Sequence, residues 1–97
     1  MTDTNNQCQT VRLCNRRGLH ARAAARFAAT ADQFPADISV CFDGRTVNGK
    51  SIMGLMMLAA AFEKDITICS QHPDSNEQQR ALEALVALVQ QRFDEPE

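Results

Sequence analysis

The 97-residue sequence lacks the segments that would direct it into or across a membrane. No apolar run approaches the roughly 20 residues of a membrane-spanning helix. The first seven residues, MTDTNNQ, have neither the basic nor the apolar region of a signal peptide. We therefore expect a cytoplasmic protein that has no membrane partner.

The sequence also lacks cysteines and histidines at the spacing of metal ligands, and it has no strong excess of one charge. No C-x-x-C pair occurs and the histidines are not clustered, so a zinc site is not expected. Cysteines in a reducing compartment most often serve as small apolar fillers, and we expect that role here. The formal net charge of −2 argues against a dedicated nucleic-acid-binding protein. The four cysteines are Cys8, Cys14, Cys41 and Cys69.

The sequence does have the composition of an ordinary globular domain, with 44% hydrophobic and 23% charged residues. It shows no internal repeat and no low-complexity linker. We expect a flexible tail over residues 1–7, a single domain over residues 8–93 and a frayed end over residues 94–97.

Hydrophobic periodicity divides the chain into strands and helices in the order β-α-β-β-α-β-α. This order predicts an α+β fold, an open-faced two-layer sandwich in which three helices cover one face of a four-stranded antiparallel sheet. The strands are expected at residues 8–14, 37–42, 45–47 and 65–70. The helices are expected from His20 to no later than Phe34, over residues 51–61, and from a Ser75–Gln78 capping box through Phe93.

Residues 44–51, GRTVNGKS, fit the phosphate-binding P-loop pattern at every position. A P-loop needs a buried parallel strand before it and a long helix after it. Asp43-Gly44 is instead typical of a hairpin turn, which makes residues 45–47 a returning strand. We expect Ser51 at the N-cap of the second helix and an accidental match to the P-loop pattern. A nucleotide-binding enzyme is the alternative that this pattern leaves open.

The run GLHAR at residues 18–22 sets a lone histidine, His20, at a helix amino terminus. A helix start attracts anions through its unpaired N–H groups and partial positive charge. Arg22 adds a fork of donors suited to phosphate, and Arg16 or Arg17 adds positive field. An imidazole is a nucleophile that is largely neutral near pH 7. The run therefore indicates a phosphoryl-accepting histidine, and the alternative is a surface histidine without a function.

Two runs carry a resemblance to a known family. NRRGLHARAAARF at residues 15–27 resembles the active-site segment of the HPr family, the histidine-containing phosphocarriers of the bacterial phosphotransferase system. NGKSIMGLMMLAAA at residues 48–61 resembles that family's second helix and the regulatory serine at its start. The element order is also that of the family, and the similarity covers essentially Val11 to Phe93.

The resemblance implies a role for three residues. His20 matches the histidine that takes phosphate on its δ1 nitrogen from phospho-enzyme I and passes it to enzyme IIA-type proteins. Arg22 matches the arginine that contacts the phosphohistidine. Ser51 matches the serine that HPr kinase/phosphorylase phosphorylates from ATP in many members. Many members have proline where this chain has Ala23, which is expected to keep the helix and only loosen its start.

The second helix has more apolar residues than one buried stripe can hold. An exposed methionine-rich patch suits a surface that accepts several partners. The resemblance implies that this patch and the region around His20 together dock enzyme I and IIA proteins. The expected docking residues are Arg16, Arg17, Ile52, Met53 and Met56.

The sequence therefore predicts a monomeric cytoplasmic phosphocarrier that is a substrate of enzymes and has no turnover of its own. Phosphoryl transfer through His20 and inhibitory phosphorylation of Ser51 need no cofactor, metal or nucleotide on this chain. The alternative is a purely regulatory HPr-like protein, in nitrogen or carbon regulation, that acts through protein contacts alone. The sequence does not decide between sugar permeases and regulatory IIA proteins as acceptors.

Overall fold

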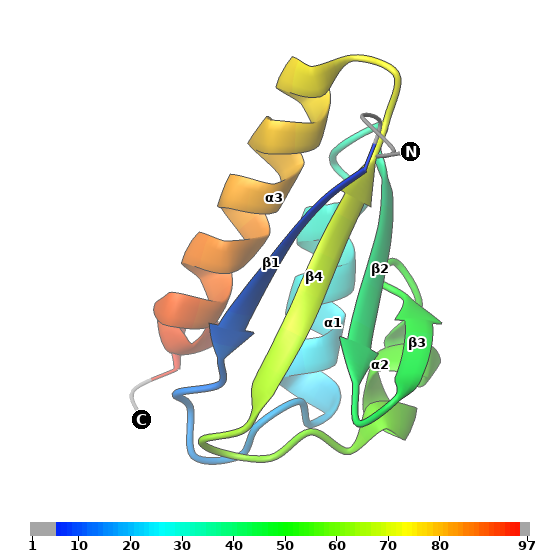
Figure 1. Cartoon of the computed structure of the whole chain (residues 1–97). Coiled ribbons are helices and arrows are strands. Elements are labelled where there is room, and N and C mark those ends of the chain that lie inside the picture. Colours follow the sequence, from blue (N-terminus) through cyan, green and yellow to red (C-terminus); the bar gives the residue numbers. More distant parts are fainter. Residues whose placement is uncertain (1–5, 96–97) are drawn as a thin grey trace.

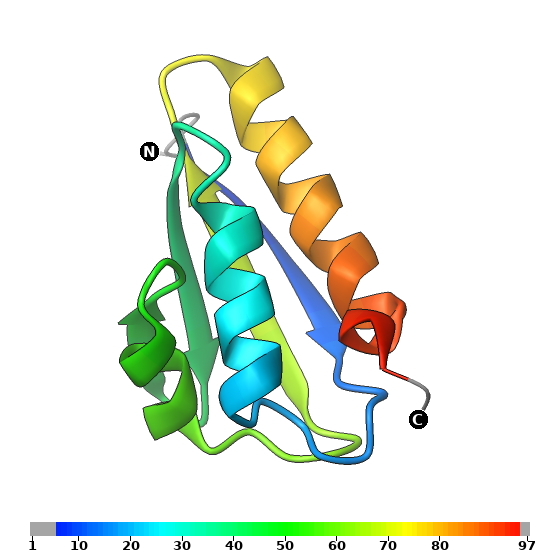
Figure 2. The ribbon, with the colours of Figure 1, turned by 180° about the vertical axis from the view of Figure 1, so that it is seen from behind.

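The structure is a computed structural model of the chain, and it describes residues 6–95. One layer is an antiparallel sheet with the strand order β1-β4-β2-β3, and the other layer is made of helices. Figure 1 looks onto the open face of the sheet, and Figure 2 shows the helices covering the opposite face. The expected open-faced α+β sandwich is confirmed. The elements are β1 (Asn6–Arg12), α1 (Ala21–Ala31), β2 (Asp37–Phe42), β3 (Arg45–Asn48), α2 (Ile52–Leu58), β4 (Asp65–Gln71), α3 (Ser75–Gln90) and the 3₁₀ helix η1 (Arg92–Asp94).

The core lies between the two layers, where the alternating strand residues meet the apolar helix stripes. Val40 and Ile68 are fully buried on neighbouring strands, and Phe27 of α1 and Leu85 of α3 are fully buried above them. Burial of such side chains contributes about 1.5–3 kcal/mol each relative to exposure, which fixes the register of the sheet. No helix within residues 6–95 is long and apolar enough to span a bilayer.

The hairpin between β2 and β3 has the expected turn at Asp43-Gly44. Both residues have positive φ, 52° and 80°, as a two-residue type I′ turn requires. The sheet is antiparallel throughout, α2 has only seven residues, and Lys50 Nζ donates to the carbonyl oxygen of Phe34 at 2.9 Å. The P-loop alternative is therefore wrong, because neither the parallel strand nor the long helix is present.

Several element boundaries differ from the sequence prediction, and the last helix, α3, ends at Gln90 rather than at Phe93. β1 runs from Asn6 to Arg12 rather than over residues 8–14, because Leu13 onward leaves the ladder with β4. α2 ends at Leu58 instead of residue 61, because Ala59 takes a left-handed conformation with φ 53°. The predicted Ser75–Gln78 capping box is wrong, since Asp74 is the N-cap and accepts from the Asn76 N–H at 2.9 Å.

The two ends of the described chain are more ordered than predicted. Gln7 lies in β1, and its side-chain amide donates to Gln78 Oε1 at 2.9 Å, so residues 6 and 7 are not a tail. Asp94 pairs with Arg26 at 3.1 Å, and Glu95 also has side-chain partners, so the expectation of a frayed end is wrong for these two residues. Residues 1–5 and 96–97 of the predicted tail and end lie outside the described residues.

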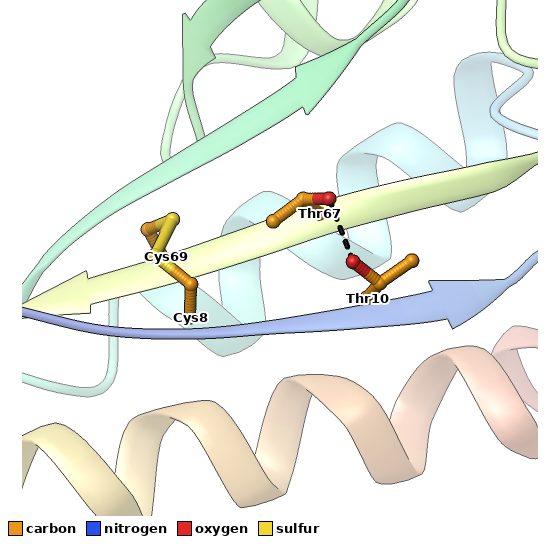
Figure 3. The surroundings of a disulfide bond; sticks show 4 residues. All are labelled: Cys8, Thr10, Thr67 and Cys69. Atoms are coloured by element: carbon orange, nitrogen blue, oxygen red, sulfur yellow. Dashed lines mark hydrogen bonds between the residues drawn. A yellow bond between two sulfur atoms is a disulfide. The ribbon is translucent and has the colours of Figure 1, made fainter.

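Two of the four cysteines form a disulfide, against the expectation that all are apolar fillers. The β1–β4 register places Cys8 directly opposite Cys69, with a Cα–Cα distance of 4.0 Å, and their sulfur atoms are bonded. Figure 3 shows the disulfide beside a cross-strand hydrogen bond between the hydroxyls of Thr10 and Thr67, 2.9 Å long. Cysteines 61 residues apart cannot be paired from spacing alone, because the pairing depends on the strand register.

Candidate functional site

The loop before α1 is pinned to the segment that follows α2. Gly18 has φ 62°, and a Cβ atom there would lie 2.4 Å from the carbonyl oxygen of Ala60. The next residue, Leu19, is buried and donates its N–H to the same carbonyl oxygen at 2.9 Å. Only glycine combines the left-handed conformation with this close approach. The loop therefore reaches His20 along a fixed path.

His20 is the N-cap of α1, as the sequence predicted. Its backbone is extended, its carbonyl oxygen accepts from Ala24 N–H at 2.8 Å, and its ring Nδ1 accepts from Arg22 N–H at 3.3 Å. The ring thus satisfies one of the N–H groups that a helix start leaves without a partner. Its side chain is 21% exposed, so most of the ring is shielded and part of it is open to solvent.

The other ring nitrogen of His20 contacts a carboxylate that sequence reasoning missed. Glu95 Oε2 lies 2.5 Å from His20 Nε2, and the Glu95 side chain is 14% exposed. Glu95 Oε1 accepts from Asn15 Nδ2 at 3.0 Å, and the same Asn15 amide donates to the carbonyl oxygen of Gly18 at 2.8 Å. Asn15 is fully buried. The site therefore contains a chain of contacts from Asn15 through Glu95 to His20.

These contacts assign the protons on the neutral ring. Nδ1 accepts a backbone N–H, so it carries a lone pair and no proton. Nε2 carries the ring proton and donates it to the Glu95 carboxylate. The nitrogen with the available lone pair is thus the one that faces the amino terminus of α1.

Arginines surround the start of α1. Arg22 lies in its first turn and is exposed, with no side-chain partner within the part of the chain that the structure describes. Arg16 and Arg17 are exposed in the preceding loop. Because α1 has no acidic residue in its first turn, the helix dipole and these guanidinium groups add positive field at the start of the helix, while the Glu95 carboxylate contacts the other ring nitrogen. The arrangement suits a transferable anion next to Nδ1.

Ser51 is the N-cap of α2, which confirms its predicted position. Its Oγ accepts from Gly54 N–H at 3.0 Å, and the residue is half-buried. Within residues 6–95, no group of three or more His, Cys, Asp or Glu side chains has an arrangement that could hold a metal ion.

The exposed side of α2 carries large apolar side chains. Leu55 and Leu58 are buried, while Ile52 and Met56 are 44% and 43% exposed and Met53 is 74% exposed. The structure thus places the three predicted docking residues of α2 on the surface. Two further apolar residues that sequence reasoning did not select, Met57 and Phe62, are 67% and 43% exposed. Phe62 lies in the segment after α2, and the α2 patch consists of Ile52, Met53, Met56 and Met57.

Comparison with known proteins gives a consistent family. Residues 7–91 match the family model described as the PTS HPr component phosphorylation site. Phosphocarrier protein HPr of Cupriavidus necator is 42% identical over 85 residues, which are 88% of this chain and 92% of that protein. The crystal structure of HPr-C-His from Thermoanaerobacter tengcongensis is 37% identical, with a TM-score of 0.85 over 94% of this chain and 99% of that chain.

A third relative is Crh of Bacillus subtilis, described as a catabolite repression protein whose crystal structure is a domain-swapped dimer. It is 43% identical and covers 86% of this chain and 92% of its own, with a TM-score of 0.69. A family model over most of the chain, together with relatives at this identity, shows the family. The chain belongs to the HPr family, the phosphocarrier proteins of the bacterial phosphotransferase system.

Proposed function

We propose that this protein accepts a phosphoryl group on Nδ1 of His20 from phospho-enzyme I and passes it to enzyme IIA-type proteins. The observation that carries the proposal is the unprotonated Nδ1 at the start of α1, in a chain of this family. In the transfer, the Nδ1 lone pair forms the N–P bond while the bond between phosphorus and its donor atom breaks. The donor keeps that electron pair. The reverse exchange delivers the group to the acceptor.

The surroundings of Nδ1 support reversible storage of the group. The phosphoryl oxygens would accept from the N–H groups at the start of α1, in place of the present contact of Nδ1 with Arg22 N–H. The Arg22 guanidinium would contribute further donors. A helix start stabilises an exposed anion by roughly 0.3–1 kcal/mol, which is enough to hold the group and too little to trap it. The protein is thus proposed to be a carrier and not an enzyme.

The α2 patch is the proposed dock for enzyme I and IIA-type proteins, together with Arg16 and Arg17. Its exposed methionines are flexible and polarisable, so one surface can adapt to several partners. The segment after α2 contacts the loop that carries His20 through the Ala60 carbonyl oxygen. A partner seated on the patch would therefore have the phosphoryl group at the edge of its contact area.

Ser51 is the proposed regulatory site, phosphorylated from ATP by HPr kinase/phosphorylase. Its hydroxyl is half-buried at the start of α2, directly before two exposed residues of the patch, Ile52 and Met53. A phosphate there adds roughly −1.5 to −2 charges, which a helix start tolerates. The added charge would oppose docking of a partner with an acidic surface, and this is the proposed inhibition.

We further propose that the carrier acts in the cytoplasm as a monomer. The strand pairs of the described sheet all form within one chain, so no second copy is needed to complete the sheet or the site. A reducing cytoplasm disfavours a lasting disulfide. Cys8 and Cys69 lie near the beginning of β1 and the end of β4. These strand ends are at the opposite end of the sheet from the start of α1 (Figure 1), so phosphoryl transfer through His20 is proposed to be independent of whether the disulfide is formed.

The experiment is incubation of the purified protein with labelled phosphoenolpyruvate and enzyme I. Acid-labile label should appear on the wild type and on His72→Ala, and it should be lost in His20→Ala. His72 is a matched control, because its Nδ1 also accepts a backbone N–H two residues on, from Asp74 at 2.9 Å. Absence of acid-labile label on the wild type, or label that survives His20→Ala, would overturn the carrier proposal.

A second candidate function is regulation through protein contacts alone, which the similarity to Crh favours. The two functions differ in whether His20 must be present. A regulator without transfer would keep binding its partner in His20→Ala and would never acquire acid-labile label. The contact of Nδ1 with Arg22 N–H at the start of α1 and the contact of Nε2 with Glu95 support transfer as the first choice.

A further inference from the structure

We propose that Glu95 is a positioning residue that fixes Nδ1 of His20 as the phosphoryl-accepting nitrogen and balances the charge that the ring acquires. The inference rests on the proposed function, since it concerns the same histidine. It goes further because it assigns a role to Glu95, a residue that the sequence predicted to lie in a frayed end.

The contacts of Glu95 are directional and largely shielded from water. Each carboxylate oxygen has a separate partner, Asn15 Nδ2 at 3.0 Å and His20 Nε2 at 2.5 Å. Asn15 is fully buried and is itself held by its bond to the Gly18 carbonyl oxygen. The Asn15 amide therefore holds the Glu95 carboxylate in place on the side away from His20. A hydrogen bond of this kind determines which imidazole nitrogen bears the proton and how the ring is oriented.

The backbone that delivers Glu95 adopts an unusual conformation to do so. Arg92, Phe93 and Asp94 have φ values of 58°, 54° and 62°, which are disfavoured for residues other than glycine. Phe93 is 3% exposed in the core, and Asp94 pairs with Arg26 of α1, so contacts on both sides hold the turn. Backbone strain of this kind is concentrated at functional sites. Its result here is that the chain turns back from α3 onto His20.

The proposed role follows from the charge balance of the transfer. Before transfer the ring is neutral, with a proton on Nε2 and a lone pair on Nδ1. Attack of Nδ1 on phosphorus forms the N–P bond, and the ring then bears a positive charge because Nε2 keeps its proton. The Glu95 carboxylate faces this charge directly, and no proton has to leave. The same bond withholds Nε2 from phosphorylation, because its lone pair is absent while it carries the proton.

Glu95→Ala tests the role, with Glu83→Ala as a control that removes the same group from an exposed position on α3. In the free protein, the Nε2–H proton of His20 should give a sharp NMR resonance in wild type and in Glu83→Ala, because the carboxylate slows its exchange. Glu95→Ala should lose that resonance. With phosphoramidate as a small donor that leaves as ammonia, wild type and the control should form Nδ1-phosphohistidine alone. Glu95→Ala should form a mixture with Nε2-phosphohistidine, and it should react at least about tenfold more slowly.

A second variant keeps the test decisive if Glu95→Ala disturbs the fold. Glu95→Gln preserves the size and an acceptor oxygen but removes the charge, so it should retain the Nε2–H resonance and lose most of the rate. An Nε2–H resonance, product nitrogen and rate that are all unchanged in Glu95→Ala would overturn the inference. Failure of the carrier proposal can be told apart from failure of this inference. If only the carrier proposal fails, wild type takes no label from enzyme I, while the Nε2–H resonance of His20 is still present in wild type and lost in Glu95→Ala.

Discussion

The starts of α1 and α2 use the same device for different purposes. In both, an N-cap side chain accepts a backbone N–H, His20 Nδ1 from Arg22 and Ser51 Oγ from Gly54, at 3.3 Å and 3.0 Å. The two caps differ in whether the side chain has a second polar atom besides the one that accepts. The imidazole has a second nitrogen, which Glu95 holds at 2.5 Å, whereas the serine has a single oxygen.

This difference explains why one cap can be prepared for transfer by its own chain and the other cannot. The histidine ring offers a lone pair to the helix start while a carboxylate fixes its other side. A hydroxyl must lose a proton to become a nucleophile, and no carboxylate or imidazole among residues 6–95 is hydrogen-bonded to Ser51 Oγ. Capping geometry alone therefore does not identify a phosphoryl acceptor. We expect Ser51 to react only when a kinase supplies the base.

The largest effect on phosphoryl transfer should come from replacing the histidine cap of α1 with serine, the residue that caps α2. His20→Ser keeps an N-cap of a preferred type, so the free energy of unfolding should change by no more than about 0.5 kcal/mol. Acceptance of phosphate from enzyme I should fall at least about a thousandfold, because the hydroxyl is not nucleophilic there. Labelling and urea unfolding of the same sample check both parts. A variant that still accepts label would mean that capping geometry is enough.

The second prediction concerns the contact that joins the His20 loop to the segment after α2. Gly18→Ala should lower the free energy of unfolding by about 3 kcal/mol, since left-handed backbone strain adds to a clash with Ala60. Gly44→Ala is the control, because φ there is 80° but no atom lies within 4 Å of the new Cβ. It should cost only about 1 kcal/mol. Equal costs in thermal unfolding would show that the close approach at Gly18 is unimportant.

A smaller effect is expected at the arginine of the His20 cap. Arg22→Lys keeps the charge but loses the planar fork of donors, so acceptance from enzyme I should slow roughly tenfold. Arg12→Lys serves as the control, since Arg12 lies on β1 and pairs with Asp65 at 3.2 Å. Transfer reactions with enzyme I that are quenched at several times give the rates of both variants. Equal rates for the two variants would remove Arg22 from the site.

The smallest effect should be found at the Ser51 cap. Ser51→Ala should lower the free energy of unfolding by about 1 kcal/mol, because Gly54 N–H loses its acceptor. Ser51→Asp should stay within about 0.5 kcal/mol of wild type, because aspartate is also a good N-cap. The aspartate should still slow transfer from enzyme I, through its charge beside the α2 patch. Urea titrations measure the stability of both variants, and assays with enzyme I measure their transfer rates. A Ser51→Asp variant that is less stable than Ser51→Ala would contradict the prediction.

Local chemistry made much of the fold predictable. The Asp43-Gly44 turn and the Ser51 cap depend on neighbouring residues, and both were found where expected. The start of α1 at His20 was predicted for the same reason. Element ends that depend on distant contacts, such as the shift of β1 to Asn6 or the left-handed stop at Ala59, were missed.

Long-range contacts of the site could not be read from the sequence. Glu95 reaches His20 across 75 positions through a left-handed turn, and acidic residues near a chain end carry no signal of such a path. The Cys8–Cys69 bond depends in the same way on strand register. A weak hint was Phe93, which extended the apolar stripe of the last helix and proved to be buried beyond its end.

The most direct test of the account is NMR of the protein, ¹⁵N-labelled at histidine and phosphorylated by enzyme I and phosphoenolpyruvate. The account predicts one phosphoramidate signal, coupled to Nδ1 of His20, with the proton still on Nε2. Phosphorus bonded to Nε2 of His20, to His72 or to an oxygen atom would contradict it.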